Sequence, residues 1–390
     1  MARMFQSHLK TVARSMSALV VAALSVFAYE AQASLPVGWT SARALGMGNA
    51  YTAVVRDGDA IFYNPAALAR VSGIHWTLID PRISINNPGN LELARDLNAD
   101  DVESLINKLY GKRVWAGVGG GKLAIWFPYF GVAAYQNSEV GVFTGARPNP
   151  RVDLDTYFDY GGAVAFAVPL VPKYFSLGAN IRYINRTGSK YPVGPATLAN
   201  LDPEDLRQQL GRRGNAYGVD FGALLTLPGP VTSSISFVYR DAGVTTFSHE
   251  EGISAPASVQ PEMIIGAGLT MDFPLVSITP AIDFRYVNWS GVQTGLNINA
   301  GIEVDLPLLA LRGGISQGYY TAGVGLDLGF IRADAATWAV ELGAYPGQHP
   351  DRRYMAQVTI EFGFDGPSMF GGGDGRSAGD SSRRGLKRRR

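Results

Sequence analysis

The sequence predicts an all-β protein: a transmembrane antiparallel β-barrel of about 14 strands with an N-terminal plug. Three observations lead to this prediction. Charged residues make up only 17% of the 390 residues, while the chain holds 47 Gly, 18 Tyr and 18 Phe. Apolar and polar residues alternate along most of the chain after residue 74. Short turns and long loops also follow one another in regular order, as in outer-membrane barrels.

The N-terminus has the pattern of a signal peptide. Three basic residues precede an apolar stretch over residues 18–28, and Ala31, Gln32 and Ala33 offer a small-x-small cleavage site. The alternative, a membrane anchor, is disfavoured because this stretch is too short to cross roughly 30 Å of hydrocarbon. We therefore expect residues 1–33 to be removed. The absence of Cys suits a chain that crosses an oxidising periplasm.

Period-two alternation predicts the strands of the barrel, because successive side chains of a strand point to opposite faces. It is clearest in residues 276–286, where Ile282 belongs to an apolar face and Asp283 to a polar one. Residues 74–364 are expected to form the barrel. The predicted strands cover residues 75–86, 122–127, 130–144, 152–168, 175–187, 215–227, 232–240, 262–272, 276–286, 295–305, 309–317, 320–329, 332–345 and 354–364.

The connections between these strands predict the topology. Short connections with Pro or Gly follow every second strand, and most of the others are longer, notably 80–121, 188–214 and 241–261. Short turns are expected at the periplasmic rim together with both termini, and long loops at the extracellular rim. Residues 91–110 and 202–210 carry helical patterns and are expected to cover the extracellular rim.

The last predicted strand ends in alternating aromatic and apolar residues, closing with Phe364. An aromatic end of this kind is what the barrel-assembly machinery reads in outer-membrane proteins. Residues 365–390 consist mainly of Gly, Ser, Asp and Arg and are expected to be a disordered basic tail. The alternative is contact with anionic lipid headgroups or cell-wall material. Membrane lipid and lipopolysaccharide are the partners expected for the barrel itself.

Several other classes of protein are disfavoured. The net charge of +1, with both signs mixed, argues against a nucleic-acid partner. Residues 117–122 look like a phosphate loop but lack its first Gly, so a hairpin or loop is expected there. No metal-ligand spacing or nucleophile elbow occurs. We expect no cofactor, no metal and no enzyme activity, the alternative being a lipid hydrolase that uses His75 or His249.

Residues 41–69 closely resemble the N-terminal plug of the FadL-type family of hydrophobic-compound transporters and its relative PorV. In both, a Gly-rich stretch leads through an acidic turn to an Asn-Pro-Ala motif. The resemblance implies that residues 34–73 form a plug inside the barrel. The plug positions that could also line a ligand passage are Gly46, Gly48, Asn64, Pro65 and Ala66.

The composition of this segment also favours a plug. Its many Gly and Ala residues allow close packing of the backbone inside a barrel. Two acids, Asp57 and Asp59, could anchor the plug by pairing with arginines on the inward face of the wall, namely Arg182, Arg285 or Arg312.

Two functions follow from the resemblance. The first is passive uptake of hydrophobic small molecules, such as long-chain fatty acids, which leave sideways through the wall of an outer-membrane barrel. The second is a PorV-like scaffold for secretion or assembly, with a plugged and non-conducting barrel. The second is favoured by the charges on the predicted inward face, which are Arg182, Asp220, Asp283, Arg285, Glu303, Asp305, Arg312 and Asp327.

Overall fold

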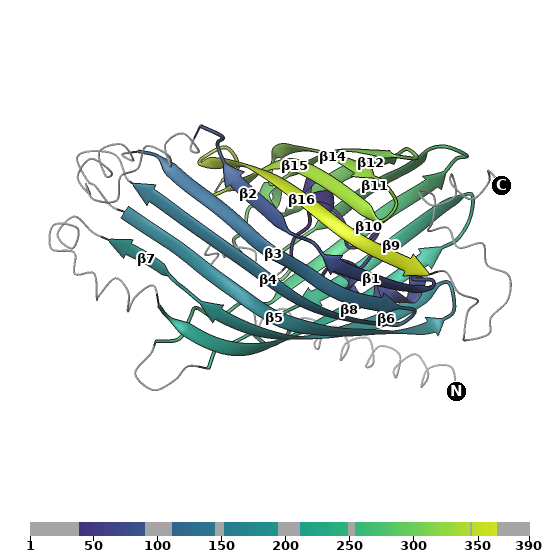
Figure 1. The fold of residues 1–390 in the computed structure, drawn as a ribbon, viewed down its shortest axis with the longest axis horizontal. Coiled ribbons are helices and arrows are strands. Elements are labelled where there is room, and N and C mark those ends of the chain that lie inside the picture. The colour runs from purple at the N-terminus through teal and green to yellow at the C-terminus, as the bar shows by residue number, and fades with distance from the viewer. Residues whose placement is uncertain are drawn as a thin grey trace, which may run out of the picture.

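The chain forms a closed antiparallel β-barrel of 14 strands in the part that the structure describes (Figure 1). The strand number and the fold class of the barrel are as predicted. The computed structural model describes residues 39–89, 111–144, 152–193, 211–248, 254–343 and 345–364. The expected signal peptide, the two helical loops at 91–110 and 202–210 and the C-terminal tail lie outside these residues.

Two strands of the barrel are interrupted, so they carry two labels each. β1 and β2 both pair with β16 and β3, and β6 and β7 both pair with β5. The strands are β1 (Ile74–Ile79), β2 (Arg82–Asn86), β3 (Arg113–Phe127), β4 (Phe130–Thr144), β5 (Val152–Val171), β6 (Phe175–Thr187), β7 (Lys190–Val193), β8 (Arg213–Leu227), β9 (Val231–Arg240), β10 (Glu262–Asp272), β11 (Ser277–Phe284), β12 (Ile298–Asp305), β13 (Leu309–Ser316), β14 (Tyr319–Asp327), β15 (Ile331–Glu341) and β16 (Pro350–Phe364).

Pairing between the first and last strands closes the barrel. Ile74 lies opposite Phe364, so β1 begins at the rim where β16 ends. The tight connections β3–β4, β5–β6, β8–β9, β10–β11, β12–β13 and β14–β15 lie at this same rim, which we call the turn rim. The longer connections lie at the opposite rim, the loop rim. Only β13 and β14 are joined there by a tight turn within the described residues.

The wall has an apolar outer face and a polar inner face. Ile282 and Ile302 point outward and are 49% and 43% exposed, whereas the neighbouring Asp283 and Glu303 point inward and are 0% and 1% exposed. This confirms the alternation expected from the sequence. A wall that shows its apolar side chains to the outside suits a lipid environment.

The predicted strand boundaries are wrong mainly at β2 and β3. The strand expected over 75–86 is interrupted at Asp80 and Pro81, since Pro cannot donate a hydrogen bond to a neighbouring strand. β3 begins at Arg113 instead of residue 122, so residues 117–122 are neither a hairpin nor a loop. Their Gly residues hide the alternation, and the register of β3 with β4 shifts between Val118 and Gly121.

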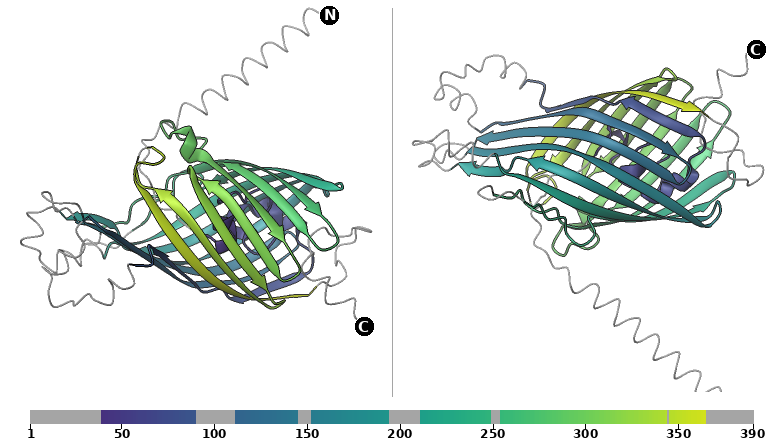
Figure 2. Two further views of the ribbon diagram at one scale, coloured as in Figure 1. Left: turned by 90° about the horizontal axis from the view of Figure 1, so that it is seen from above. Right: turned by 60° about the horizontal axis from the view of Figure 1, so that its bottom comes forward.

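Residues 39–73, which we call the inner segment, lie inside the barrel (Figure 2). The segment contains the short helices α2 (Ala42–Gly46) and α3 (Ala60–Tyr63) and the 3-10 helix η1 (Pro65–Arg70). Most of its side chains are buried, and they form the main apolar core together with inward-facing residues of the wall. Among the described residues, no helix is long and apolar enough to cross a membrane.

Because the outer face of the wall is apolar, the loss of unfolding free energy caused by an added charge should depend strongly on where the charge is placed. Replacing Ile302 with Arg should cost roughly 2–4 kcal/mol of unfolding free energy, because the side chain would face hydrocarbon near the middle of the wall. The matched control is Leu275→Arg in the β10–β11 turn, where the cost should fall to about 0–1 kcal/mol. Urea unfolding in lipid vesicles measures both. Equal costs at the two positions would contradict a membrane-facing wall.

Candidate functional site

The inner segment contacts β12, β13 and β14 where glycines bring the two backbones together. A Cβ atom on Gly46 would lie 3.0 Å from the Cα atom of Gly323, and one on Gly48 would lie 2.4 Å from the carbonyl oxygen of Ala300. Gly48 also has a φ of 67°, which an L side chain rarely adopts. On the wall, a Cβ atom on Gly301 would lie 2.1 Å from the carbonyl oxygen of Met47. No side chain separates the segment from the wall at these points.

The Asn-Pro-Ala motif makes a similar contact on β6 and β8. Asn64 is fully buried and caps η1, because its side chain accepts a hydrogen bond from the Ala66 amide at 3.1 Å. Its amide group donates to the Thr52 carbonyl at 3.0 Å, which ties η1 to an earlier part of the segment. A Cβ atom on Gly178 would lie 2.3 Å from the Ala66 nitrogen. The motif therefore shapes the inner segment and fits it to the wall.

Hydrogen bonds fix two further parts of the inner segment. Asp283 of β11 accepts bonds from the backbone amides of Tyr51 and Thr52 at 3.0 and 3.1 Å. Arg70, at the end of η1, donates to Thr226 and Ser234 of the wall, each at 2.6 Å. Arg70 forms no ion pair within the described residues. Burial and the nearby charge of Arg56 lower the pKa of Arg70 to about 9.

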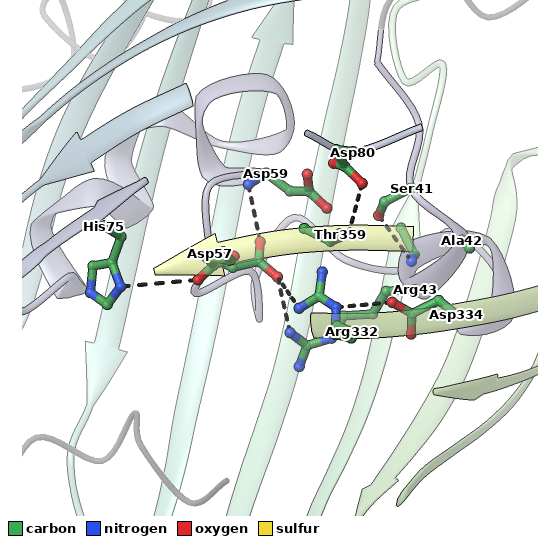
Figure 3. A network of polar contacts seen from close by, with 12 residues as sticks. Ser41, Ala42, Arg43, Asp57, Asp59, His75, Asp80, Arg332, Asp334 and Thr359 are labelled. Carbon is green, nitrogen blue, oxygen red and sulfur yellow. Dashed lines mark hydrogen bonds and ion pairs between the residues drawn. The ribbon is translucent and has the colours of Figure 1, made fainter. Parts of the chain in front are cut away.

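Arg43 of α2 is the centre of a partly buried ion-pair network (Figure 3). Its guanidinium donates to Glu303 of β12 at 2.5 and 2.8 Å and to Asp57 at 3.0 Å. Arg332 of β15 approaches Asp57 to 3.8 Å and pairs with Asp334 at 2.9 Å. Burial by itself raises the pKa of Asp57, but the charges of Arg43, Arg332 and Lys122 outweigh burial and lower it. Asp57 therefore stays ionised and holds the segment to the wall.

A second ion pair joins α3 to the interrupted strand. Lys122 of β3 lies 2.5 Å from Asp59 and 3.6 Å from Asp80, and all three side chains are nearly fully buried. Asp80 also accepts hydrogen bonds from Gln357 and Thr359 of β16, each at 2.7 Å. The break between β1 and β2 thus points a carboxylate into the barrel, where it joins two other strands and the inner segment.

The acids of the inner segment have other partners than the ones expected. Arg182, Arg285 and Arg312 do lie on the inward face, but their partners are carboxylates of the wall and of its connections. Arg182 pairs with Asp220 and Asp241, Arg285 pairs with Glu262, and Arg312 pairs with Glu303 and Asp334. The wall acids on the same or adjacent strands are closer to these arginines than Asp57 and Asp59 are. Arg312 is linked to the inner segment through Glu303, which it shares with Arg43.

The wall has a seam, an interruption of pairing between β3 and the strand made by β1 and β2. On the β2 side, the last ladder pair joins Arg82 to Gly119. On the β1 side, the next ladder pair joins Thr77 to Ala124, and no ladder pair forms between these two. At the seam, Gly121 has a φ of 111°, and a Cβ atom there would lie 2.7 Å from the carbonyl carbon of Asp80. The two strands touch there without forming ladder pairs. The seam lies beside the Lys122 ion pairs and the inner segment.

An aromatic cluster lies on the loop-rim side of the inner segment. It contains Trp115 of β3 and Trp338 of β15, whose ring centroids are 6.5 Å apart in an edge arrangement. Leu45 of α2 and Met355 of β16 belong to the same buried cluster. These buried side chains form an apolar cluster between the inner segment and the loop rim.

His75 contacts the inner segment and β3 and approaches β16. Its ring lies 2.7 Å from the Ser72 carbonyl oxygen and stacks on Trp126, and its Nδ1 atom lies 4.0 Å from Glu361. His249 lies outside the described residues. Within those residues, no group of His, Asp and Glu side chains could hold a metal ion.

Sequence reasoning missed Arg43, Arg332 and Lys122 as the residues that pair with the acids of the inner segment. Lys122 follows a Gly-rich stretch and so looked like part of a loop. Lys122, Ala124 and Trp126 are two residues apart and so share one face of the strand. This spacing would have placed Lys122 on the inward face. No local pattern identifies Arg43, because its partners come from β12 and from a distant part of the same segment.

The fold defines an antiparallel barrel with a folded segment inside it, and a search of solved structures finds similar barrels. The chain is similar to a deltaS2S3 mutant of the TodX monoaromatic hydrocarbon channel, with 11% identity and a TM-score of 0.49 over 85% of this chain and 100% of that chain. The chain is also similar to the CymD monoaromatic hydrocarbon channel, with 11% identity and a TM-score of 0.47 over 85% of this chain and 100% of that chain. A third similar structure is the toluene transporter TbuX of Ralstonia pickettii, with 12% identity and a TM-score of 0.41 over 84% of this chain and 99% of that chain.

All three of these structures have TM-scores below 0.5 with this chain. No protein-family model and no curated protein matches the sequence.

The backbone contact at Gly178 predicts that a single methyl group displaces the inner segment. Gly178→Ala would place the methyl carbon 2.3 Å from the Ala66 nitrogen, so the backbone of the motif must move. Gly313→Ala is the matched control, since a Cβ atom there meets nothing within 4 Å. A cysteine at the fully buried Ala67, the sole thiol of the chain, should react with maleimide much faster in the Gly178→Ala background than in the control. Equal reactivity would contradict the tight fit.

Proposed function

We propose that the protein is an outer-membrane channel for passive uptake of hydrophobic small molecules, of the long-chain fatty acid kind. In this proposal, residues 34–73 are a plug that closes the barrel, residues 74–364 are the membrane wall, and both termini of the mature chain are periplasmic. The expected signal peptide and the apolar outer face of the wall support the location. Lipid and lipopolysaccharide would surround the wall, and Phe364 would be read by the barrel-assembly machinery.

The single observation that carries the proposal is the seam beside the inner segment. A barrel of this size needs something in its lumen to remain sealed. The inner segment supplies it, and it contacts the wall at so many points that passage straight through the lumen would require most of them to break. Within the seam itself, no ladder pair has to break. We therefore propose that hydrophobic cargo enters at the loop rim and leaves sideways between β3 and the interrupted strand.

A second candidate is a scaffold for secretion or assembly with a non-conducting barrel. The ion-pair network of Arg43, Glu303, Asp57 and Arg332 favours it, because a lumen crossed by buried charges offers no continuous apolar path at that level. Such a network also holds the plug rigidly, which suits a fixed scaffold. Uptake measurements separate the two candidates.

Cross-linking the seam tests the channel. Leu78 and Leu123 both face outward in the stretch without ladder pairs, and the chain has no Cys of its own. A disulfide between Leu78→Cys and Leu123→Cys should abolish most uptake of radiolabelled oleate by cells that depend on this protein, and reduction should restore uptake. The control disulfide joins Val132→Cys and Val164→Cys, which already face each other in the continuous β4–β5 ladder, and should leave uptake unchanged.

Two results would count against the proposal. Full uptake through the oxidised Leu78–Leu123 pair would exclude the seam as the exit. No uptake of oleate or toluene by the unmodified protein, above that of cells lacking it, would exclude the channel and favour the scaffold.

A further inference from the structure

Arg70 is a partly buried cation that no carboxylate neutralises within the described residues. It ends η1, and its guanidinium donates only to uncharged oxygens. These are the Thr226 hydroxyl at 2.6 and 3.1 Å, the Ser234 hydroxyl at 2.6 Å and the Ala53 carbonyl at 3.0 Å. Arg43 of the same segment, by contrast, pairs with two carboxylates. A charge that leaves water without a partner is costly, so a counter-ion is expected beside Arg70.

Arg56 adds a second positive charge beside Arg70. Its guanidinium donates to the Thr270 hydroxyl of β10 at 2.6 Å. Burial lowers the pKa of Arg56, and burial together with the charge of Arg56 lowers the pKa of Arg70. Asp272, exposed at the end of β10, opposes the shift of Arg56, but no described carboxylate opposes that of Arg70. Two cations therefore share one solvent-exposed acid.

The hydroxyls around the two arginines also have protons to donate. Thr226 and Ser234 lie opposite each other on β8 and β9, and Thr270 lies on the inner face of the next strand, β10. Each hydroxyl accepts a hydrogen bond from a guanidinium, which leaves its own O–H group to donate. In the described part of the chain, no oxygen accepts these three protons. The surface thus combines cationic and hydroxyl donors and lacks acceptors.

This surface can be reached from the turn rim. Arg56, Arg70 and Thr226 are partly exposed, unlike the fully buried residues deeper in the inner segment. The hydroxyls lie within a few residues of the turn-rim ends of β8, β9 and β10. A ligand arriving at this rim would therefore meet the two arginines before it met the Arg43 ion pairs.

We infer that Arg56 and Arg70, with the hydroxyls of Thr226, Ser234 and Thr270, bind a phosphate group at the turn rim. A phosphate monoester carries about two negative charges and three strong acceptor oxygens, which suits two guanidiniums and a row of hydroxyls. Guanidiniums also form strong, charge-assisted hydrogen bonds with phosphate. The group belongs either to a lipid headgroup or to free phosphate. The inference goes beyond the proposed function, because this ligand binds at the rim opposite the proposed cargo entrance.

Titration calorimetry on the purified full-length protein in a non-ionic detergent tests the site, with chloride keeping the ionic strength constant. The probes are inorganic phosphate, a soluble short-chain phosphatidic acid, and the diacylglycerol with the same chains, which has no phosphate. The wild-type protein should bind a phosphate probe and should not bind the diacylglycerol. Arg70→Gln and Arg56→Gln should each weaken phosphate binding about tenfold or more, because each removes a charged donor. Arg70→Lys keeps the charge without the planar fork and should weaken it less.

Lys112→Gln is the matched control. It removes one positive charge from an exposed position at the loop rim, so it should bind phosphate as the wild type does. Thermal unfolding shows that each variant is folded and gives a second readout. Phosphate should raise the unfolding temperature of the wild type and of Lys112→Gln, and it should raise that of Arg70→Gln much less.

The two phosphate probes separate the sources of the ligand. Tighter binding of phosphatidic acid than of inorganic phosphate would assign the site to a lipid headgroup, and equal or weaker binding would assign it to free phosphate. No binding of either phosphate probe by the wild type would overturn the inference. The same affinity in the wild type, Arg56→Gln and Arg70→Gln would also overturn it. Neither of these results bears on oleate uptake, so the proposed channel would stand or fall by its own test.

Discussion

The position of the inner segment inside the barrel depends on close backbone contact between this segment and the wall. Glycines on both sides of this contact remove the side chains that would keep the two apart, as at Gly48 against Ala300 and at Gly178 against Ala66. Inward positions of a barrel are usually filled by side chains. Here a folded segment takes that place, and the polar inward face of the wall then becomes useful, because its carboxylates and hydroxyls meet the backbone groups and arginines of the segment.

The same contacts explain why the charged lumen and the proposed apolar cargo are compatible. Buried charges are costly unless they are paired, and removing one partner of such a pair typically costs about 3–5 kcal/mol. Arg43, Glu303 and Asp57 pair among themselves at the level of the inner segment. The Trp115 cluster lies on its loop-rim side, and the seam lies beside it in the wall. The charges of Arg43 and Asp57 are thus paired within the inner segment and with Glu303, while a buried apolar cluster lies on its loop-rim side.

The sequence predicted most of the wall and little of the site. The bounds of β4, β6 and β10 follow from clear alternation that ends at a turn, so prediction and structure agree there. The first part of β3 was missed because its glycines have no side chains and so show no alternation of polar and apolar residues. The partners of Asp57 and Asp59 could not be predicted, since they depend on which strands the segment meets in three dimensions. Trp115 was missed because an aromatic residue suits either face of a barrel strand.

The conductance of the protein in planar bilayers tests most directly whether the inner segment closes the barrel. The intact protein should show little ion conductance. A variant that lacks residues 39–66, which removes α2, α3 and the Asn-Pro-Ala motif, should still insert and should conduct like an open pore. An intact protein that already conducts as strongly as this deletion variant would contradict the account, because the lumen would then be open despite the segment inside it.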